Sequence, residues 1–390
     1  MAPARPSSGS SKSAALRRAA GEVLMVGLAG PSLRPDEQAW LKLIRPGGII
    51  LFRRNVDTPG QTHALLRAAK EAQAGGKAAR GEMLEPLFRA IDVEGGTVDR
   101  LRDLVAPAPS AFAVAGTGKA PLFAMHGRLI GRELRLLGLN ITLAPVLDLR
   151  TVASLGVLTT RAVSSDPAKV IAYARGFLKG LSQAGVLGCG KHFPGLGSGQ
   201  VDSHDSTPAI ERSFASLWND DLLPYRKLAG ELALVMVSHA RYPFTASTGD
   251  PASVSHFWAT EILGKKIGFR GLVISDDMEM GGILTHTTLA DATIRALLAG
   301  THIIEICHEP ARIFTAFEAL LSEAERSSAF SRKLLGAARR VRAFKKEHLG
   351  ADRLPAPPTA DAIGRVRAQL VRFAEQVSSV EHGGRKGIEP

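Results

Sequence analysis

The chain has 390 residues, of which 45% are hydrophobic, and its formal net charge at pH 7 is +12. A chain of this length can bury a large core, and barrels of this size commonly form one domain. The positive charge does not indicate a nucleic-acid-binding protein, because the Lys and Arg residues are scattered among 37 acidic residues and only three Trp and three Tyr are available for base stacking.

The first 19 residues are polar and rich in Ser, and they lack the continuous apolar core and small-residue cleavage site of a secretory signal. We expect a disordered tail over 1–19. No segment is apolar over the length that a bilayer span requires. The two cysteines, Cys189 and Cys307, lie in apolar strand-like runs, which is typical of buried free thiols in a reducing compartment. The sequence therefore predicts a cytoplasmic protein that has no membrane partner.

Eight short apolar runs alternate with longer segments of helical spacing. The runs predict strands at 23–26, 48–52, 87–91, 141–147, 186–189, 234–237, 272–274 and 302–306. The intervening segments predict helices at 58–74, 121–137, 167–184, 212–230, 256–267, 288–299 and 309–324. Strands that are apolar throughout and alternate with amphipathic helices favour a (β/α)8 barrel over an antiparallel sandwich, and a doubly wound open sheet is the alternative.

The positions of ionisable residues favour the barrel over the open sheet. They stand at the carboxyl ends of the predicted strands: Asp92, Asp148, Lys191 with His192, His239, Asp276, and Glu305 or His308. In a barrel these ends converge on one mouth, where the chemistry of such folds is found. We predict an α/β fold with a single (β/α)8 catalytic domain over 20–348. A C-terminal helical extension over 349–390 follows, made of a Pro-rich spacer, an accessory helix and a disordered tail without catalytic residues.

Two segments carry the chemistry. Residues 191–204 read Lys-His-Phe-Pro-Gly-Leu-Gly-Ser-Gly-Gln-Val-Asp-Ser-His, and a later apolar strand ends on Asp276. A carboxylate there suits a nucleophile, although a helix N-cap would also fit the position. Asp202 lies two residues before His204, and a neighbouring carboxylate fixes the tautomer of an imidazole and raises its pKa, so that it can exchange a proton with a leaving group. Together these groups suit a covalent glycosidase mechanism, while a surface role is the alternative for His204.

A second set of residues is suited to holding a sugar. Lys191 and His192 end a strand before a Pro-Gly turn, so both side chains can point into the mouth as hydrogen-bond donors, with structural ion pairing as the alternative. Asp92, in the segment Ile-Asp-Val-Glu-Gly-Gly-Thr-Val-Asp-Arg at 91–100, can accept two sugar hydroxyls. We expect Glu94 to brace the Gly-Gly turn.

Metal and cofactor sites are not expected. The chain has no His-Glu-x-x-His and no Cys cluster, and His192, Asp202 and His204 alone would make a weak metal site. The glycines of Gly-Leu-Gly-Ser-Gly at 195–199 match neither a Walker loop nor a dinucleotide-binding loop. A Gly-x-Ser-x-Gly hydrolase elbow is also absent from the sequence.

These motifs in combination resemble glycoside hydrolase family 3, in its single-domain β-N-acetylhexosaminidase branch. The resemblance covers roughly residues 20–345 and rests on the segment at 91–100, Ala-Pro-Val-Leu-Asp at 144–148, Arg161 before Ser-Ser-Asp-Pro, Lys-His-Phe-Pro-Gly at 191–195, Asp-Ser-His at 202–204 and Ser-Asp-Asp-Met at 275–278. It implies that Asp276 is the nucleophile, His204 the acid/base and Asp202 its orienting partner. It also implies a binding set for the terminal N-acetylglucosamine: Asp92, Arg100, Arg161, Lys191 and His192.

The resemblance further implies an exo-acting retaining β-N-acetylglucosaminidase that acts on peptidoglycan-derived muropeptides through a covalent intermediate, without metal or organic cofactor. A small-molecule carbohydrate is the expected partner. The sequence leaves the oligomeric state open, with a monomer favoured. A β-glucosidase-like activity and phosphorolysis are alternatives, the latter because a neutral imidazole repels an anion less than a second carboxylate does. A non-catalytic barrel that binds muropeptides is a further alternative. The Gly-rich loop is expected to move so that His204 reaches the scissile bond.

Three positions depart from the family pattern. Leu196 stands where a His is usual, Val93 where a Gln is usual and Val163 where a Phe is usual. We expect Leu196 and Val93 to make the rim of the pocket less polar. Both leave the acid/base pair and the nucleophile intact, so they bear on substrate preference more than on reaction type.

Overall fold

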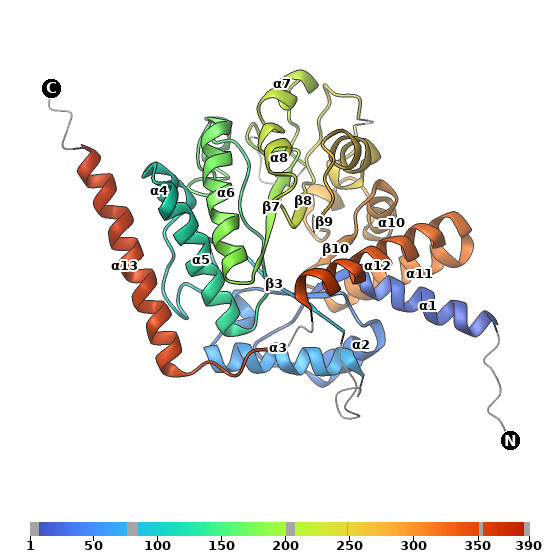
Figure 1. The fold of residues 1–390 in the computed structure, drawn as a ribbon. Coiled ribbons are helices and arrows are strands. Elements are labelled where there is room, and N and C mark those ends of the chain that lie inside the picture. Colours follow the sequence, from blue (N-terminus) through green and yellow to red (C-terminus); the bar gives the residue numbers. More distant parts are fainter. Residues whose placement is uncertain (1–7, 76–84, 200–206, 248, 351–353, 386–390) are drawn as a thin grey trace.

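A computed structural model describes residues 8–75, 85–199, 207–247, 249–350 and 354–385. Eight parallel strands form a closed barrel in the order β1-β10-β9-β8-β7-β6-β3-β2. Figure 1 shows strands β7 to β10 of this barrel with helices on both sides of them. The strands are β1 Leu24–Gly27, β2 Gly48–Leu51, β3 Phe88–Ile91, β6 Ile141–Thr142, β7 Leu187–Phe193, β8 Leu234–Val237, β9 Leu272–Asp277 and β10 Ile303–Ile306. Met25 of β1 pairs with Gly48 on one side and with Glu305 on the other, which closes the barrel between its first and last strands. The predicted (β/α)8 barrel is confirmed.

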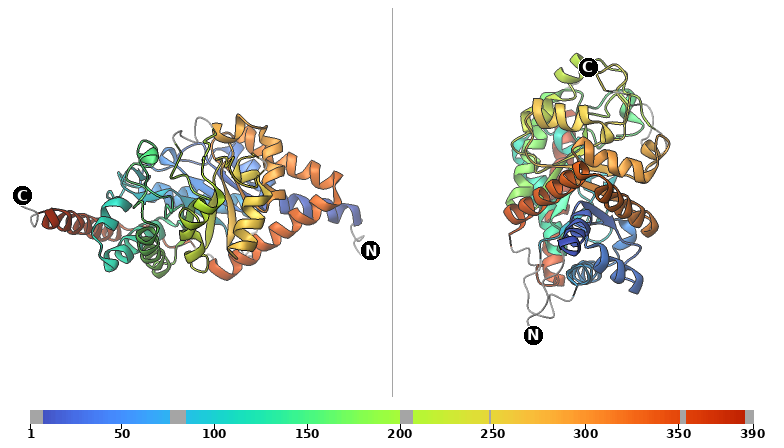
Figure 2. Two further views of the ribbon diagram at one scale, coloured as in Figure 1. Left: turned by 90° about the horizontal axis from the view of Figure 1, so that it is seen from above. Right: turned by 90° about the vertical axis from the view of Figure 1, so that its right-hand side faces the viewer.

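Helices cover the outside of the barrel in both further views (Figure 2). Those that follow strands are α2 Pro35–Ile44, α3 Pro59–Ala74, α4 Ala111–Gly116, α5 Ala120–Leu137, α6 Pro167–Gln183, α7 Phe214–Asn219, α8 Leu223–Leu228, α9 Gly281–Leu284, α10 Leu289–Ala299, α11 Pro310–Arg326 and α12 Ser328–Leu349. A π-helix, η5 Phe257–Lys266, stands between β8 and β9, and short 3-10 turns lie at η1 Arg53–Asn55, η3 Ala153–Leu155 and η4 Ala252–Val254. Local capping explains several starts: the Asp166 carboxylate accepts the Ala168 N–H at 2.8 Å where α6 begins.

Alternation along the strands divides the core into two parts. Within β8, β9 and β10, residues such as Met236, Ile274 and Ile303 join an apolar cluster inside the barrel, and their neighbours in sequence pack against the helices. The end of α12 closes the barrel at the amino ends of the strands. There Phe344 contacts Phe88, the first residue of β3, with ring centroids 6.2 Å apart. The opposite end of the barrel, where the strands have their carboxyl ends, contains the pocket.

The N-terminal prediction needs a correction. Where a disordered tail was expected over 1–19, residues Ser8–Glu22 form the helix α1. Its Leu16 and Ala19 are buried, and α1 packs along α12, so tertiary burial stabilises a segment that looks polar in isolation. Glu22, near its end, makes a buried ion pair with Lys345 of α12 at 2.6 Å.

The C-terminal extension is a helix that docks on the barrel. α13 Ala360–Arg385 packs against α5 and α4 and buries Leu370, Phe373 and Val377. It lies at the opposite end of the molecule from α1 (Figure 2). No helix in the described ranges is long and apolar enough to cross a membrane.

Two local features differ from the expected elements. The helix predicted over 212–230 is divided into α7 and α8, because Pro224 starts a new helix. After β3 the chain forms a small antiparallel pair, β4 Val93–Gly95 and β5 Val98–Asp99. Gly95 and Gly96 make its turn with φ of 88° and 66°, and a Cβ on Gly95 would stand 2.2 Å from the Pro109 carbonyl oxygen, so glycine is required there.

Candidate active site

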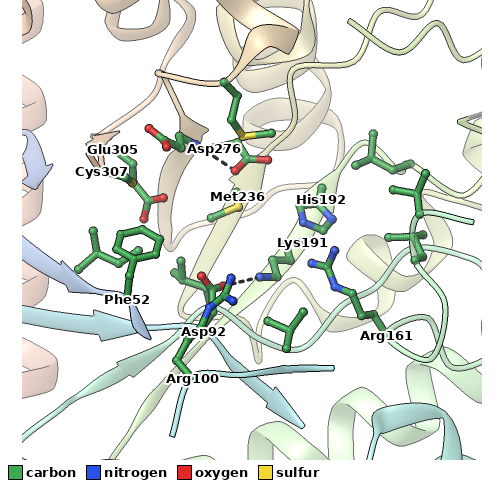
Figure 3. Close-up of a pocket in the computed structure, with 18 of the residues that line it drawn as sticks. Phe52, Asp92, Arg100, Arg161, Lys191, His192, Met236, Asp276, Glu305 and Cys307 are labelled. Carbon is green, nitrogen blue, oxygen red and sulfur yellow. Dashed lines mark hydrogen bonds and ion pairs between the residues drawn. The ribbon is translucent and has the colours of Figure 1, made fainter. Parts of the chain in front are cut away.

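A pocket opens at the carboxyl ends of the barrel strands, and six predicted site residues line it together: Asp92, Arg100, Arg161, Lys191, His192 and Asp276 (Figure 3). Lys191 and His192 lie on β7, Asp276 on β9, and Asp92 between β3 and β4. The remaining two predicted residues, Asp202 and His204, lie outside the described residues.

Glu94 joins two cations on one wall of the pocket. Its carboxylate receives two hydrogen bonds of 2.9 Å from Arg161 and lies 2.7 Å from Lys191 Nζ, which is also 2.8 Å from Asp92. Burial alone would raise the pKa of Glu94, but Arg161 and Lys191 lower it to about 2. We expected Glu94 to brace the Gly-Gly turn. This expectation is wrong, because the carboxylate of Glu94 contacts Arg161 and Lys191 and orients them instead.

The two cations remain charged because of these carboxylates. Burial by itself would lower the pKa of Lys191, yet Asp92 and Glu94 raise it above its usual value. Burial would also lower the pKa of Arg161, but the negative charge of Glu94 is the main cause that raises it. A fixed array of charged donors and acceptors of this kind suits the hydroxyl groups of a sugar, because charge-assisted hydrogen bonds are the stronger ones.

His192 is held by a buried carboxylate. Its Nδ1 lies 2.6 Å from Asp148 Oδ2, and its backbone N–H also donates to Asp148. This contact leaves Nε2 as the ring nitrogen that is available to a ligand. Asp148 ends a predicted strand in the sequence, but nothing in the sequence shows that its partner is His192, 44 residues away.

Asp276 stands on the pocket wall opposite Asp92 (Figure 3). Its Oδ1 accepts the Asp277 N–H at 2.9 Å. Burial would raise the pKa of Asp276, but His192, His239, the Asp277 N–H and Lys191 together lower it below its usual value. The pocket therefore presents an ionised carboxylate at neutral pH.

Asp277, the next residue, has structural contacts. Its Oδ1 accepts the Glu279 N–H at 3.0 Å, and its Oδ2 lies 3.2 Å from His308 Nε2. The hydrogen bond to Asp277 is the main cause of the raised pKa of His308. His239 is also tied down, with Nε2 2.9 Å from the Asp277 carbonyl oxygen.

Arg100 and Glu305 line the pocket with unpaired atoms. Within the described part of the chain, neither Arg100 Nε nor Glu305 Oε1 has a hydrogen-bond partner, although both atoms are buried. Arg100 belongs to the predicted set, whereas Glu305 was seen in the sequence only as an ionisable residue at a strand end.

The departures from the family pattern lie in different surroundings. Leu196 lines the pocket, as expected, and its N–H donates to Asp148 Oδ1 at 2.7 Å. Val93 and Val163 are buried in the apolar core instead. The expectation that Val93 makes the rim less polar is therefore wrong, because its side chain faces the core and does not line the pocket. In the described ranges, no group of His, Cys, Asp and Glu is arranged to hold a metal ion.

Comparison with known proteins agrees with this geometry. The model of the glycosyl hydrolase family 3 N-terminal domain matches residues 15–343. A β-hexosaminidase of Pseudomonas aeruginosa is 34% identical over 298 residues, which cover 76% of this chain and 86% of that protein.

Two solved structures show the same fold. The family 3 β-N-acetylglucosaminidase from Paenibacillus sp. superposes with a TM-score of 0.81 at 28% identity, covering 92% of this chain and 68% of that chain. Native NagZ from Neisseria gonorrhoeae superposes with a TM-score of 0.70 at 26% identity, covering 90% and 97% respectively. The chain therefore belongs to glycosyl hydrolase family 3 and is a glycoside hydrolase similar to the β-hexosaminidases of that family.

Proposed function

We propose that this protein is an exo-acting, retaining β-N-acetylglucosaminidase that releases terminal N-acetylglucosamine from peptidoglycan-derived muropeptides. The observation that carries the proposal is the pairing of an ionised carboxylate, Asp276, with the Lys191–Asp92–Glu94–Arg161 array across the same pocket. The array can bind the hydroxyl groups of a sugar. The Asp276 carboxylate, on the other side of the pocket, can then attack the anomeric carbon of that sugar.

In the first step, an Asp276 oxygen forms a bond to the anomeric carbon while the bond to the leaving oxygen breaks. His204 gives a proton to that oxygen, and Asp202 orients the imidazole. In the second step, water loses a proton to His204 and attacks the anomeric carbon, which releases Asp276. Two inversions retain the β configuration of the sugar.

The sugar-binding assignment follows from the unused polar atoms of the pocket. The Nε2 atom of His192 is directed away from Asp148, and Arg100 Nε has no partner among the described residues. Arg100 Nε supplies a donor to substrate oxygens in addition to those of Lys191 and Arg161, and Nε2 of a neutral His192 ring accepts a hydrogen bond from a sugar hydroxyl. Polar groups that converge on one terminal sugar in this way fit exo action.

Hydrolysis of chromogenic substrates tests the reaction. The purified protein should cleave p-nitrophenyl N-acetyl-β-glucosaminide at least tenfold faster than the glucoside and should release N-acetylglucosamine from the non-reducing end of a purified muropeptide. NMR should show the β-anomer as the first product. Equal rates on the two chromogenic substrates, or a first product of α configuration, would contradict the proposal.

Phosphate is a second acceptor that one observation favours. The guanidinium of Arg100 lines the pocket, and its positive charge would attract a phosphate anion that could replace water in the second step. Product analysis in phosphate and in a non-nucleophilic buffer separates the two reactions. Formation of N-acetylglucosamine 1-phosphate would show phosphorolysis, whereas equal rates without sugar phosphate would rule it out.

We also propose a cytoplasmic location. It is supported by Cys189 and Cys307, which are both buried free thiols. Fractionation of the producing cells tests this point: the protein should be found with cytoplasmic marker enzymes, and its recovery with the periplasmic or secreted fraction would contradict it.

A further inference from the structure

Glu305 occupies an unusual place for an acidic residue. It lies on β10 between Ile303 and Cys307, which both belong to the apolar cluster inside the barrel. Alternation along the strand points Glu305 into the same interior. Its side chain reaches the pocket beside Phe52, on the side away from Arg161 (Figure 3).

The backbone of Glu305 is fully used, but its carboxyl group is not. The Glu305 N–H donates to Ser275 Oγ at 3.0 Å, and its carbonyl oxygen accepts the Met278 N–H at 3.0 Å. The residue is 2% exposed, and its Oε1 is buried without a partner in the described part of the chain. Leaving such a group unpaired costs about 1–3 kcal/mol, so a role in the fold alone does not account for it.

Burial, and after it the surrounding negative charges, raise the pKa of Glu305 well above its usual value. Asp276 and Asp277 on β9 and Asp92 after β3 are all close enough to raise its pKa, after burial as the largest cause. Lys191 on β7 acts against this shift, but Asp92 and Glu94 already hold this cation. Two further titratable neighbours, the thiols of Cys189 and Cys307, are buried and have raised pKa values themselves.

The pKa values of Asp276 and Glu305 are thus shifted in opposite directions although the two residues line one pocket. The pKa of Asp276 is lowered by its neighbours, while that of Glu305 is raised. Pairs of carboxyl groups whose surroundings separate their pKa values in this way commonly have separate tasks. An ionised Asp276 suits attack on the sugar, and a neutral carboxyl group can donate a hydrogen bond that a carboxylate cannot.

We propose that Glu305 is a further sugar-binding residue, which acts as a neutral carboxylic acid and donates a hydrogen bond to an oxygen of the bound N-acetylglucosaminyl unit. This inference rests on the proposed function. Because Glu305 lies beside the carboxylate that attacks the anomeric carbon, its partner belongs to one of the two ring edges that flank this carbon. The two oxygens concerned are the acetamido carbonyl oxygen and the hydroxymethyl oxygen.

Two variants of nearly equal size isolate the hydrogen bond. Glu305→Gln keeps a donor at every pH, and Glu305→Met keeps the length of the side chain without a donor. On p-nitrophenyl N-acetyl-β-glucosaminide, kcat/KM of the Gln variant should exceed that of the Met variant about tenfold. The ratio should fall to near one on a single analogue, either the 6-deoxy compound or the glucoside, which identifies the bound oxygen.

The remaining outcomes overturn the inference. A ratio near one on the parent substrate, or the same ratio on all three substrates, would show that Glu305 does not bind the sugar. Thermal unfolding separates a structural role: the Met variant should unfold at the same or a higher temperature, because it removes an unpaired buried acid. Lower stability with unchanged kcat/KM would assign Glu305 to the fold instead. Failure of the wild-type protein to cleave the parent substrate would refute the proposed function, and is distinct from these results.

Discussion

Asp148 orients His192 and the start of the following loop through one carboxylate. Its Oδ2 lies 2.6 Å from His192 Nδ1, and its Oδ1 accepts the N–H of Leu196 at 2.7 Å. The carboxylate is buried and therefore fixes both partners in a place where water cannot substitute for it. The imidazole is thus presented to the pocket in one orientation.

Replacing Asp148 should disturb binding of the sugar. In Asp148→Asn the charge-assisted contact with His192 is lost, so we expect kcat/KM for the chromogenic N-acetylglucosaminide to fall roughly tenfold to a hundredfold. Steady-state kinetics measures the effect. Asp166→Asn is the matched control, because it removes a carboxylate that caps α6 and does not line the pocket. Unchanged kinetics in Asp148→Asn would show that His192 needs no such partner.

Glu94 should stabilise the protein in a pH-dependent way. Its pKa is about 2 in the folded protein against a usual value of 4.5, so its stabilisation is present above pH 4.5 and is lost as pH falls toward 2. Near pH 6 we expect Glu94→Gln to be less stable than the wild type by about 3 kcal/mol, and the difference to shrink by roughly half near pH 3. Chemical denaturation at several pH values measures it. A difference that does not change with pH would contradict the ionised state of Glu94.

His126 should also make the protein less stable in acid, but in a higher pH range than Glu94 does. It is buried on α5, with its ring stacked on Phe373 of α13 at 5.7 Å, and burial lowers its pKa to about 3 from 6.5. The neutral ring is tolerated above pH 6.5, and stability is lost as pH falls below this value because only the unfolded chain takes up the proton.

The variant His126→Phe should lose less stability between about pH 7 and pH 5 than the wild type, by about 2 kcal/mol. Denaturation curves at the two pH values give this difference. The variant also loses the hydrogen bond between His126 and Tyr173. This loss lowers the stability equally at both pH values, so it does not change the difference between them. The same pH dependence in both proteins would show that His126 titrates normally.

Asp276 should be indispensable to cleavage, whereas its neighbour should not. We expect Asp276→Ala to lower kcat at least about a thousandfold, because the covalent step loses its nucleophile. Added azide should restore turnover by entering from the vacated side, and the product should be the α-glycosyl azide. Asp277→Asn is the matched control and should keep most of the activity. Rescue that yields the β-azide would contradict direct attack by Asp276.

The strands and the polar residues at their ends could be predicted from the sequence because each depends on local pattern. The apolar runs identify the barrel strands, and the ionisable residues that follow them, such as Asp92 and Asp276, line one pocket. The sequence pattern did not show which of these side chains contact one another. The contacts of Glu94 with Arg161 and of Asp148 with His192 join residues 67 and 44 positions apart, and only the closed barrel brings them together.

The N-terminal helix escaped prediction for a related reason. α1 is rich in Ser and weakly amphipathic, so its sequence alone does not favour an ordered segment. It is stabilised by burial of Leu16 and Ala19 and by the ion pair between Glu22 and Lys345, which involves two residues 323 positions apart. Glu305 is a further case, because its apolar surroundings are visible in the sequence but the neighbouring carboxylates are not.

Trapping of the covalent intermediate tests the central claim most directly. An N-acetylglucosaminyl fluoride with a second fluorine on the ring slows both steps through its electron-withdrawing effect, while the fluoride leaving group speeds the first step, so the glycosyl-enzyme accumulates. Mass spectrometry of the intact protein should show one added sugar, and peptide mapping should place it on Asp276. A sugar attached to Asp277 or Glu305, or turnover of the reagent without any attached sugar, would contradict the account.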